Sequence, residues 1–135
     1  MSVLKSKRRV SGVQFLETAR DLHLFTMQTC IKFVPKRYTF YLSQPAIMTA
    51  YNIHACVKRG NSIFPTTKRD YEMRREQFIM AVAELQNLVS QINIIYEMFP
   101  MPDNVSTKLL GLIDSELNLV KGAIKKDEER YKDLV

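Results

Sequence analysis

Apolar residues recur every three or four positions in four long segments of this chain, and that spacing is typical of helices that bury one face. The clearest stripe lies in Lys68–Met98, where Leu85, Leu88 and Ile92 are expected to be buried. Four of the 135 residues are glycine, which is few for the many tight turns of a sandwich or a barrel. The sequence therefore predicts an all-α protein.

Four helices with short connections pack best as an antiparallel up-down-up-down four-helix bundle, and the chain has the length of one such domain. We expect the bundle domain to occupy residues 13–135, after a basic N-terminal arm at residues 1–12. Antiparallel order would bring the start of the first helix, the loop after the second and the end of the fourth to one end. The expected helices run from Val13 to Phe33, from Tyr38 to Arg59, from Lys68 to Met98 and from Asp103 to Lys132.

Prolines, glycines and short polar residues mark where these helices are expected to begin, break and end. Pro45 lacks a backbone donor, so the second helix should kink or break briefly near Ser43 and Gln44. Gly60 and Asn61 are typical of the residues that end a helix. The expected N-terminal caps are Ser11, Thr66 or Thr67, and Asp103.

Positive charge is concentrated in the first half of the chain. Residues 1–75 hold fourteen Lys and Arg against four Asp and Glu, whereas residues 76–135 hold six against ten. Clustered positive charge attracts polyanions, so nucleic acid is the partner class that this distribution favours. Arg74 and Arg75 are expected to be exposed. The alternative to nucleic-acid contact is an ordinary solvated face, in which they pair with Asp70, Glu72 and Glu76 at helical spacing. The candidate contact residues are Lys7, Arg8, Arg9, Lys36, Arg37, Lys58, Arg59, Lys68, Arg69, Arg74 and Arg75.

Several tyrosines lie near these basic residues in the sequence. An exposed aromatic ring can stack on the bases of a single strand and add to the attraction of the charges. The alternative is a tyrosine at the boundary of the bundle, with its ring packed and its hydroxyl in water. The tyrosines to which both interpretations apply are Tyr38, Tyr41, Tyr51 and Tyr71.

No residue pattern indicates a catalytic or metal site. A carboxylate metal centre in a helical bundle needs Glu-x-x-His pairs, and the sequence has none. His23 and His54 are instead expected to be partly buried, with one hydrogen-bond partner each. Cys30 and Cys56 are expected to be buried and unbridged. The four glycines are too scattered for a phosphate-binding loop, so we expect a non-catalytic protein without a metal or cofactor.

The sequence also favours a location away from membranes. No apolar run approaches the roughly 18–20 residues that span a bilayer. The basic start of the chain is soon followed by Glu17, Arg20 and Asp21, which interrupt the apolar stretch that a signal peptide needs. A cytoplasmic protein with reduced cysteines is expected.

Three short stretches resemble a known family. They are Val34–Phe40 (VPKRYTF), Arg74–Phe78 (RREQF) and Ala83–Leu85 (AEL). The chain resembles, from roughly Val13 to Arg130, the bacterial four-helix bundle family that contains the accessory variability determinant (Avd) of diversity-generating retroelements. The same family contains the proteins encoded in 23S ribosomal RNA intervening sequences.

This resemblance implies a ring-shaped homopentamer with a basic surface. It also implies a partner, since the retroelement member binds its reverse transcriptase and nucleic acid during mutagenic retrohoming. Lys36 and Arg37 match the basic turn of the family, and Arg74 and Arg75 match the basic start of the third helix. The arm and the C-terminal tail extend beyond the matched part, so a sister branch with a different partner is the alternative.

Charge and resemblance together favour a non-catalytic, nucleic-acid-binding accessory protein to a reverse transcriptase. The alternative is an oligomeric helical scaffold that docks an acidic protein partner, and an all-helical enzyme ranks third. Apolar residues lie off the main stripes of the second and third helices, and we expect part of this surplus to form a homo-oligomer interface. These residues include Tyr41, Met48, Tyr51, Ile79, Ile94 and Tyr96.

Overall fold

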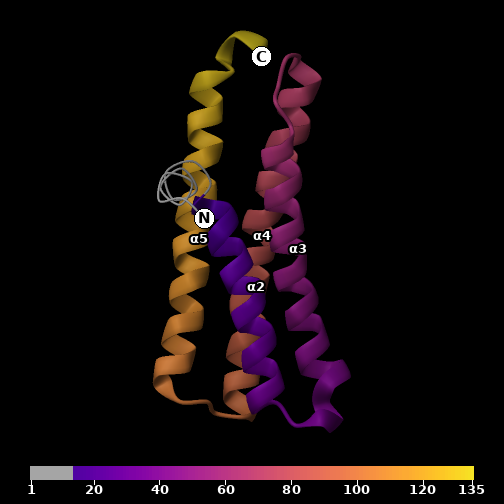
Figure 1. Cartoon of the computed structure of the whole chain (residues 1–135), viewed down its shortest axis with the longest axis vertical. Coiled ribbons are helices and arrows are strands. Elements are labelled where there is room, and N and C mark those ends of the chain that lie inside the picture. Colours follow the sequence, from indigo (N-terminus) through magenta and orange to yellow (C-terminus); the bar gives the residue numbers. More distant parts are fainter. Residues whose placement is uncertain (1–13) are drawn as a thin grey trace, which may run out of the picture.

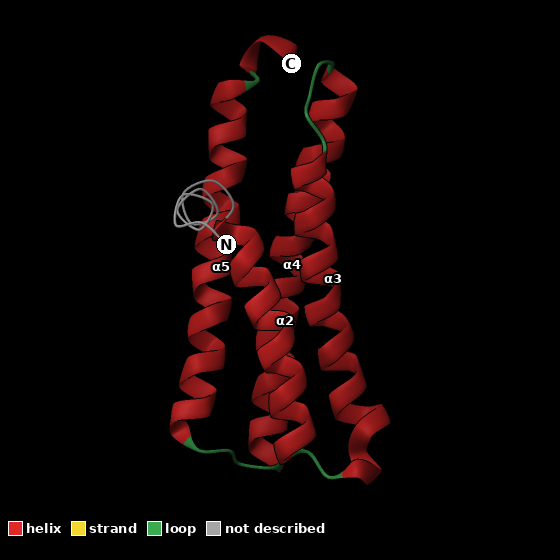
Figure 2. Cartoon of the chain, viewed as in Figure 1, coloured by secondary structure: helices red, strands yellow, loops and turns green. Residues whose placement is uncertain are grey.

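The computed structural model describes residues 14–135, which form helices joined by short loops (Figure 1, Figure 2). No strand occurs among these residues, so the all-α prediction is confirmed for them. The predicted arm and the predicted cap Ser11 lie outside the described residues. The long helices are α2 (Gln14–Phe33), α3 (Gln44–Ser62), α4 (Lys68–Met98) and α5 (Asp103–Arg130). The short ones are η1 (Lys36–Tyr38), η2 (Thr39–Ser43) and η3 (Lys132–Leu134).

Each long helix packs against the next along the chain, and α2 also packs against α5. Successive long helices run in opposite directions, which confirms the predicted antiparallel up-down-up-down bundle (Figure 1). The described start of α2 lies part-way along α5, short of the end where the sequence analysis placed it (Figure 1). The end of α3, the start of α4 and the end of α5 meet at that end, which we call the α3–α4 end.

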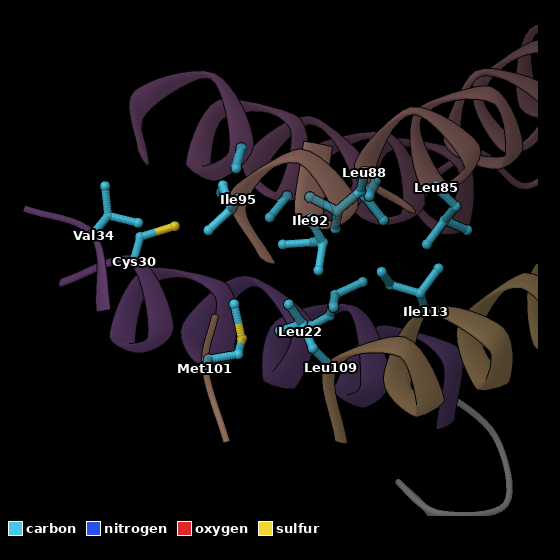
Figure 3. Packing of buried hydrophobic residues seen from close by; sticks show 13 residues of the cluster. Leu22, Cys30, Val34, Leu85, Leu88, Ile92, Ile95, Met101, Leu109 and Ile113 are labelled. Atoms are coloured by element: carbon cyan, nitrogen blue, oxygen red, sulfur yellow. The ribbon is translucent and has the colours of Figure 1, made fainter. Parts of the chain in front are cut away.

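The core consists of two clusters of buried apolar side chains. The larger cluster draws on all four long helices and includes Leu85, Leu88 and Ile92, as the sequence predicts (Figure 3). The smaller cluster lies nearer the α3–α4 end and includes Phe78 and Val120. The apolar stripes therefore meet along the bundle axis, and removal of these side chains from water is the main force holding the helices together.

Replacing Leu88 with Ala is expected to lower the free energy of unfolding by about 2–5 kcal/mol, because Leu88 is fully buried and a cavity would remain. Urea denaturation followed by circular dichroism measures the change. The control is Leu110→Ala, because Leu110 lies on α5 with 37% of its surface exposed and should change stability far less. A loss of under about 0.5 kcal/mol at Leu88 would place the core on another face of α4.

The bounds of α4 agree with the sequence prediction, and its cap is Thr67. The Thr67 hydroxyl oxygen accepts a hydrogen bond from the Asp70 backbone N–H at 3.1 Å. The prediction of Asp103 as the cap of α5 is wrong, because Pro102 holds that position and makes no side-chain cap. Asp103 is instead the first helical residue, where its charge still meets the positive end of the helix dipole.

Pro45 changes the helix before it, as expected. The residues Thr39–Ser43 form one π-helical turn, and α3 begins at Gln44 with Pro45 in its first turn. The Gln44 backbone N–H donates to the carbonyl oxygen of Thr39, a five-residue span. Proline has no N–H to offer to the preceding turn, so the wider turn takes up the change in hydrogen bonding.

Gly60 does not end the second helix, so this prediction is wrong. Helix α3 continues to Ser62, and no glycine among the described residues has a positive φ. The glycine is needed for packing, because a Cβ atom at Gly60 would lie 2.5 Å from the Phe78 ring. The close approach of α3 and α4 at the α3–α4 end therefore depends on this residue.

Helix α4 is long and apolar enough to cross a membrane when judged by length and composition alone. The sequence expectation that no segment reaches this level is wrong by that measure. The core helix of a soluble bundle gives the same result, so this is weak evidence for a membrane. In the structure one stripe of α4 is buried in the bundle, while Ile79 and Ile94 are exposed on other faces.

Candidate nucleic-acid interface

Four of the predicted contact residues are exposed around one loop. Lys58 and Arg59 lie in the last turns of α3, and Lys68 and Arg69 are the first two residues of α4. Residues 63–67 join the two helices. All four side chains are exposed, so the structure brings two of the basic pairs to the same end of the bundle with their charges in water.

Acidic side chains lie among these basic ones. Lys68 Nζ lies 4.0 Å from Glu72 Oε1, one turn further along α4, and both side chains are more than half exposed. Asp70 is held by Thr66, whose backbone N–H and hydroxyl donate to Oδ2, and these bonds lower the pKa of Asp70. Such exposed pairs contribute little to stability and leave the basic groups free to exchange partners.

Arg74 is the main correction to the predicted site, because it is buried, with 7% of its surface exposed. Its Nε and Nη2 donate to the two carboxylate oxygens of Asp127 on α5, at 2.6 and 3.3 Å. Its Nη1 donates to the carbonyl oxygens of Gly60 and Ile63, at 3.2 and 3.0 Å. Arg74 precedes Phe78 by one helical turn, and this spacing places it on the buried face of α4. Its guanidinium joins α3, α4 and α5 and is not available to a phosphate.

The other predicted contacts are spread over the molecule. Arg75 is half-buried, and its Nη1 donates to Glu128 Oε1 at 3.0 Å, a bond that raises the pKa of Arg75. Lys36 and Arg37 are exposed in η1, at the end of the bundle opposite to the α3–α4 end (Figure 1). The Arg37 guanidinium lies 5.2 Å from the centre of the Tyr38 ring. Lys7, Arg8 and Arg9 lie outside the described residues.

The structure brings two histidines together from different helices. Nδ1 of His23 on α2 lies 3.2 Å from Nδ1 of His54 on α3, so each is the hydrogen-bond partner of the other. Burial lowers the pKa of both, and the charges of His23, Lys58 and Arg20 lower that of His54 further. The sequence predicts part-burial and one partner each. The pairing itself was missed, although antiparallel packing about the Pro35 turn brings these parts of α2 and α3 level.

The histidine pair lines a groove of about 420 Å³ between α2 and α3. The half-exposed Tyr51 packs edge-on against His23, with ring centres 5.7 Å apart. No group of three or more His, Cys, Asp or Glu within residues 14–135 could hold a metal ion. The groove is lined by His23, Tyr51, His54, Ala55, Lys58 and Arg59.

A buried acid on α5 was also missed. Glu116 is fully buried, and neither of its carboxylate oxygens has a hydrogen-bond partner among the described residues. Burial raises its pKa to about 9, so the side chain is protonated at neutral pH. It follows Ile113 by three residues and precedes Val120 by four, and that helical spacing could have shown that it lies on the buried face. These two neighbours belong to different core clusters, so Glu116 lies between the clusters.

Both cysteines are free and buried, as predicted. Cys30 belongs to the larger core cluster and Cys56 to the smaller one. Burial raises the pKa of the Cys30 thiol to about 11, although a hydrogen bond with Ser43 opposes the rise. Burial also raises the pKa of Cys56. At neutral pH both side chains are thiols, and a thiol is a weak nucleophile.

Comparisons of the chain with family models, with curated proteins and with solved structures gave no match. The structure shows an all-helical four-helix protein, and no family match supports membership of the Avd family.

Proposed function

We propose that this chain is a cytoplasmic, non-catalytic protein that binds nucleic acid through the α3–α4 end of the bundle. The observation that carries the proposal is the exposure of Lys58, Arg59, Lys68 and Arg69 around one short loop. Side chains of this kind neutralise phosphates and release condensed counterions, which gives binding that depends on salt and little on sequence.

The resemblance to the Avd family supports a more specific role. In that role the protein would act beside a reverse transcriptase, as an accessory factor that holds the nucleic acid. The support is the sequence likeness of Val34–Phe40, which the structure places at the turn into the second helical segment. Co-purification with a reverse transcriptase encoded beside this chain tests the role, and a chain that never co-purifies with it would contradict it.

Changing Lys68 and Arg69 together to Glu is expected to lower the affinity for structured RNA or DNA at least tenfold, about 1.4 kcal/mol. The fold should survive, because both residues are exposed in the first turn of α4, where the helix dipole favours negative charge. Fluorescence anisotropy at two salt concentrations measures the affinity. Arg74 is left unchanged because it is buried.

The matched control is Lys36 and Arg37 changed together to Glu, which alters the net charge equally at the opposite end (Figure 1). This variant should lose less affinity than the change at Lys68 and Arg69. A larger loss at Lys36 and Arg37 would move the interface to η1. Absence of binding by the unaltered protein at low salt would reject nucleic-acid binding.

We also propose that the protein forms a homo-oligomer, which the resemblance suggests is a pentamer. The apolar residues predicted off the main stripes are exposed, including Ile79 and Ile94 on α4 at 47% and 51%. Changing both to Lys is expected to give a monomer by light scattering, because charge opposes burial in an interface. The control is Ile31→Lys. Ile31 lies on α2, outside the predicted interface residues of the second and third helices, so this change should leave the oligomer intact. An unaltered protein that is monomeric at micromolar concentration would contradict the proposal.

A second candidate function is a scaffold that docks an acidic protein partner. The exposed apolar side chains of α4 lie on the same helix as Lys68 and Arg69, and a helix that carries both exposed apolar and basic side chains suits a protein interface. This function is favoured if the oligomer forms but nucleic acid does not bind at low salt.

A further inference from the structure

The groove between α2 and α3 has a composition that suits an anion. Its lining contains two imidazoles, one ammonium group and one guanidinium group, from His23, His54, Lys58 and Arg59, and no carboxylate. Lys58 and Arg59 are both basic side chains, and both are exposed. A dication would be repelled here, whereas a phosphate would be attracted.

The charges that face the histidine pair come from the elements packed around it. On α2, Arg20 acts on His54, while its Nη1 lies 3.5 Å from Asp21 Oδ1 and both side chains are mostly in water. On α3, Lys58 acts on His54 as well. On α4, Glu84 accepts from Asn52 Nδ2 and Gln77 accepts from Arg59 Nε. The two histidines therefore lie in a field that is positive on balance.

The geometry of the pair limits its protonation. The two Nδ1 atoms are 3.2 Å apart, which leaves room for one hydrogen between them, so one ring donates and the other accepts. If both Nδ1 atoms carried a proton, the two N–H groups would point at each other and repel, and the hydrogen bond between the histidines would break. Each ring could then donate to an acceptor in the groove. A phosphate supplies acceptor oxygens and the negative charge that offsets the added proton.

We propose that this groove binds one phosphodiester of a single-stranded nucleic acid, and that the His23–His54 pair takes up one proton from solvent as the phosphate enters. Lys58 and Arg59 are the basic side chains that face the phosphate in the groove. Tyr51 is 51% exposed beside His23, and its ring is the surface on which the adjacent base stacks. The inference rests on the proposed nucleic-acid binding and assigns to it a defined subsite and a dependence on pH.

Proton uptake makes affinity depend on pH in a defined direction. Burial lowers the pKa of both histidines in the free protein, and neighbouring charges lower that of His54 further. A bound phosphate raises both pKa values. Between the free and bound values one proton is taken up per phosphate, so affinity rises up to about tenfold per unit fall in pH. Phosphodiesters keep their charge over this range, so the change belongs to the protein.

The experiment measures binding of a short labelled oligo-dT by fluorescence anisotropy, at about pH 5.5 and about pH 7.5 and constant salt. The unaltered protein is compared with His23→Asn combined with His54→Asn. As the pH falls from about 7.5 to about 5.5, we expect the affinity of the unaltered protein to rise about tenfold more than that of the double variant. Parallel pH dependence in the two proteins overturns the subsite and leaves the proposed function standing. Circular dichroism checks that the double variant is folded.

Two further measurements keep the inference testable if that variant fails to fold. Lys58→Gln, at an exposed position, should weaken oligo-dT binding at both pH values, and unchanged binding counts against the subsite. In the unaltered protein, NMR titration of the imidazole signals with oligo-dT should show a raised pKa, and an unchanged pKa overturns the inference.

Pyrophosphate in place of oligo-dT tests the phosphate alone, and tighter binding of pyrophosphate would identify a free-phosphate site. If no oligonucleotide binds at either pH, the proposed function and this subsite both fail.

Discussion

Replacing Arg74 with Ala is expected to lower the free energy of unfolding by about 3–5 kcal/mol, the range found when one partner of a buried ion pair is removed. The substitution would leave Asp127 buried without its counter-charge, and would free the carbonyl oxygens of Gly60 and Ile63. Urea denaturation at neutral pH measures the loss. The α3–α4 end should loosen first, because Arg74 joins three helices there.

The neighbouring arginine provides the control. Arg75→Ala removes the same kind of side chain from a part-exposed position, together with its hydrogen bonds to Glu128 and Tyr71, so it should change stability by about 1 kcal/mol or less. A similar effect of the two substitutions would show that the Arg74–Asp127 pair is reached by water in the folded protein. A second comparison is Asp127→Asn, which keeps the size of the side chain but removes its charge and should also destabilise.

Replacing Glu116 with Gln is expected to remove a pH dependence of stability of about 1.4 kcal/mol per pH unit. Burial raises the pKa of Glu116 from 4.5 to about 9, so between these values the folded protein holds a proton that the unfolded chain releases. The free energy of unfolding therefore falls as the pH rises through this window. Below about pH 4.5 both states hold the proton and the contribution vanishes.

Urea denaturation of both proteins from about pH 5 to about pH 8 tests this, and the difference between them should change by about 4 kcal/mol. Other titrating groups are common to both proteins and cancel in the difference. Glu116→Leu should also be more stable than the unaltered protein at neutral pH, because it removes a buried polar group without a partner. Parallel curves for the unaltered protein and Glu116→Gln would mean that Glu116 ionises freely in the fold.

The helices and their order follow from local properties of the sequence. The stripe of Lys68–Met98 and its cap at Thr67 predict α4 with the correct bounds, because helical period, capping and proline geometry act over a few residues. The break before Gln44 follows in the same way from Pro45. Short connections between four such helices then favour the antiparallel order that the structure shows.

The candidate site depends much less on local pattern. Arg74 and Arg75 are adjacent and chemically alike, yet the first is buried and the second partly exposed. Their positions on the helix differ by about 100°, so one faces the core and the other its edge. The spacing of Arg74 four residues before Phe78 could have shown its burial, but the stripe does not name Asp127 as the partner. The basic charge of the sequence therefore predicts a class of partner more readily than it predicts the residues in contact.

The sequence by itself determined the all-α class, the bounds of α4 and its cap at Thr67, the break before Gln44, and the burial of Leu85, Leu88 and Ile92. The tertiary structure decided what those helices bring together. Arg74 meets Asp127 across 53 residues of chain, and His23 meets His54 across 31. Gly60 serves the packing of Phe78 rather than a helix end. Such contacts depend on the register between packed helices, which the summed fit of many side chains fixes and which no short stretch of sequence encodes.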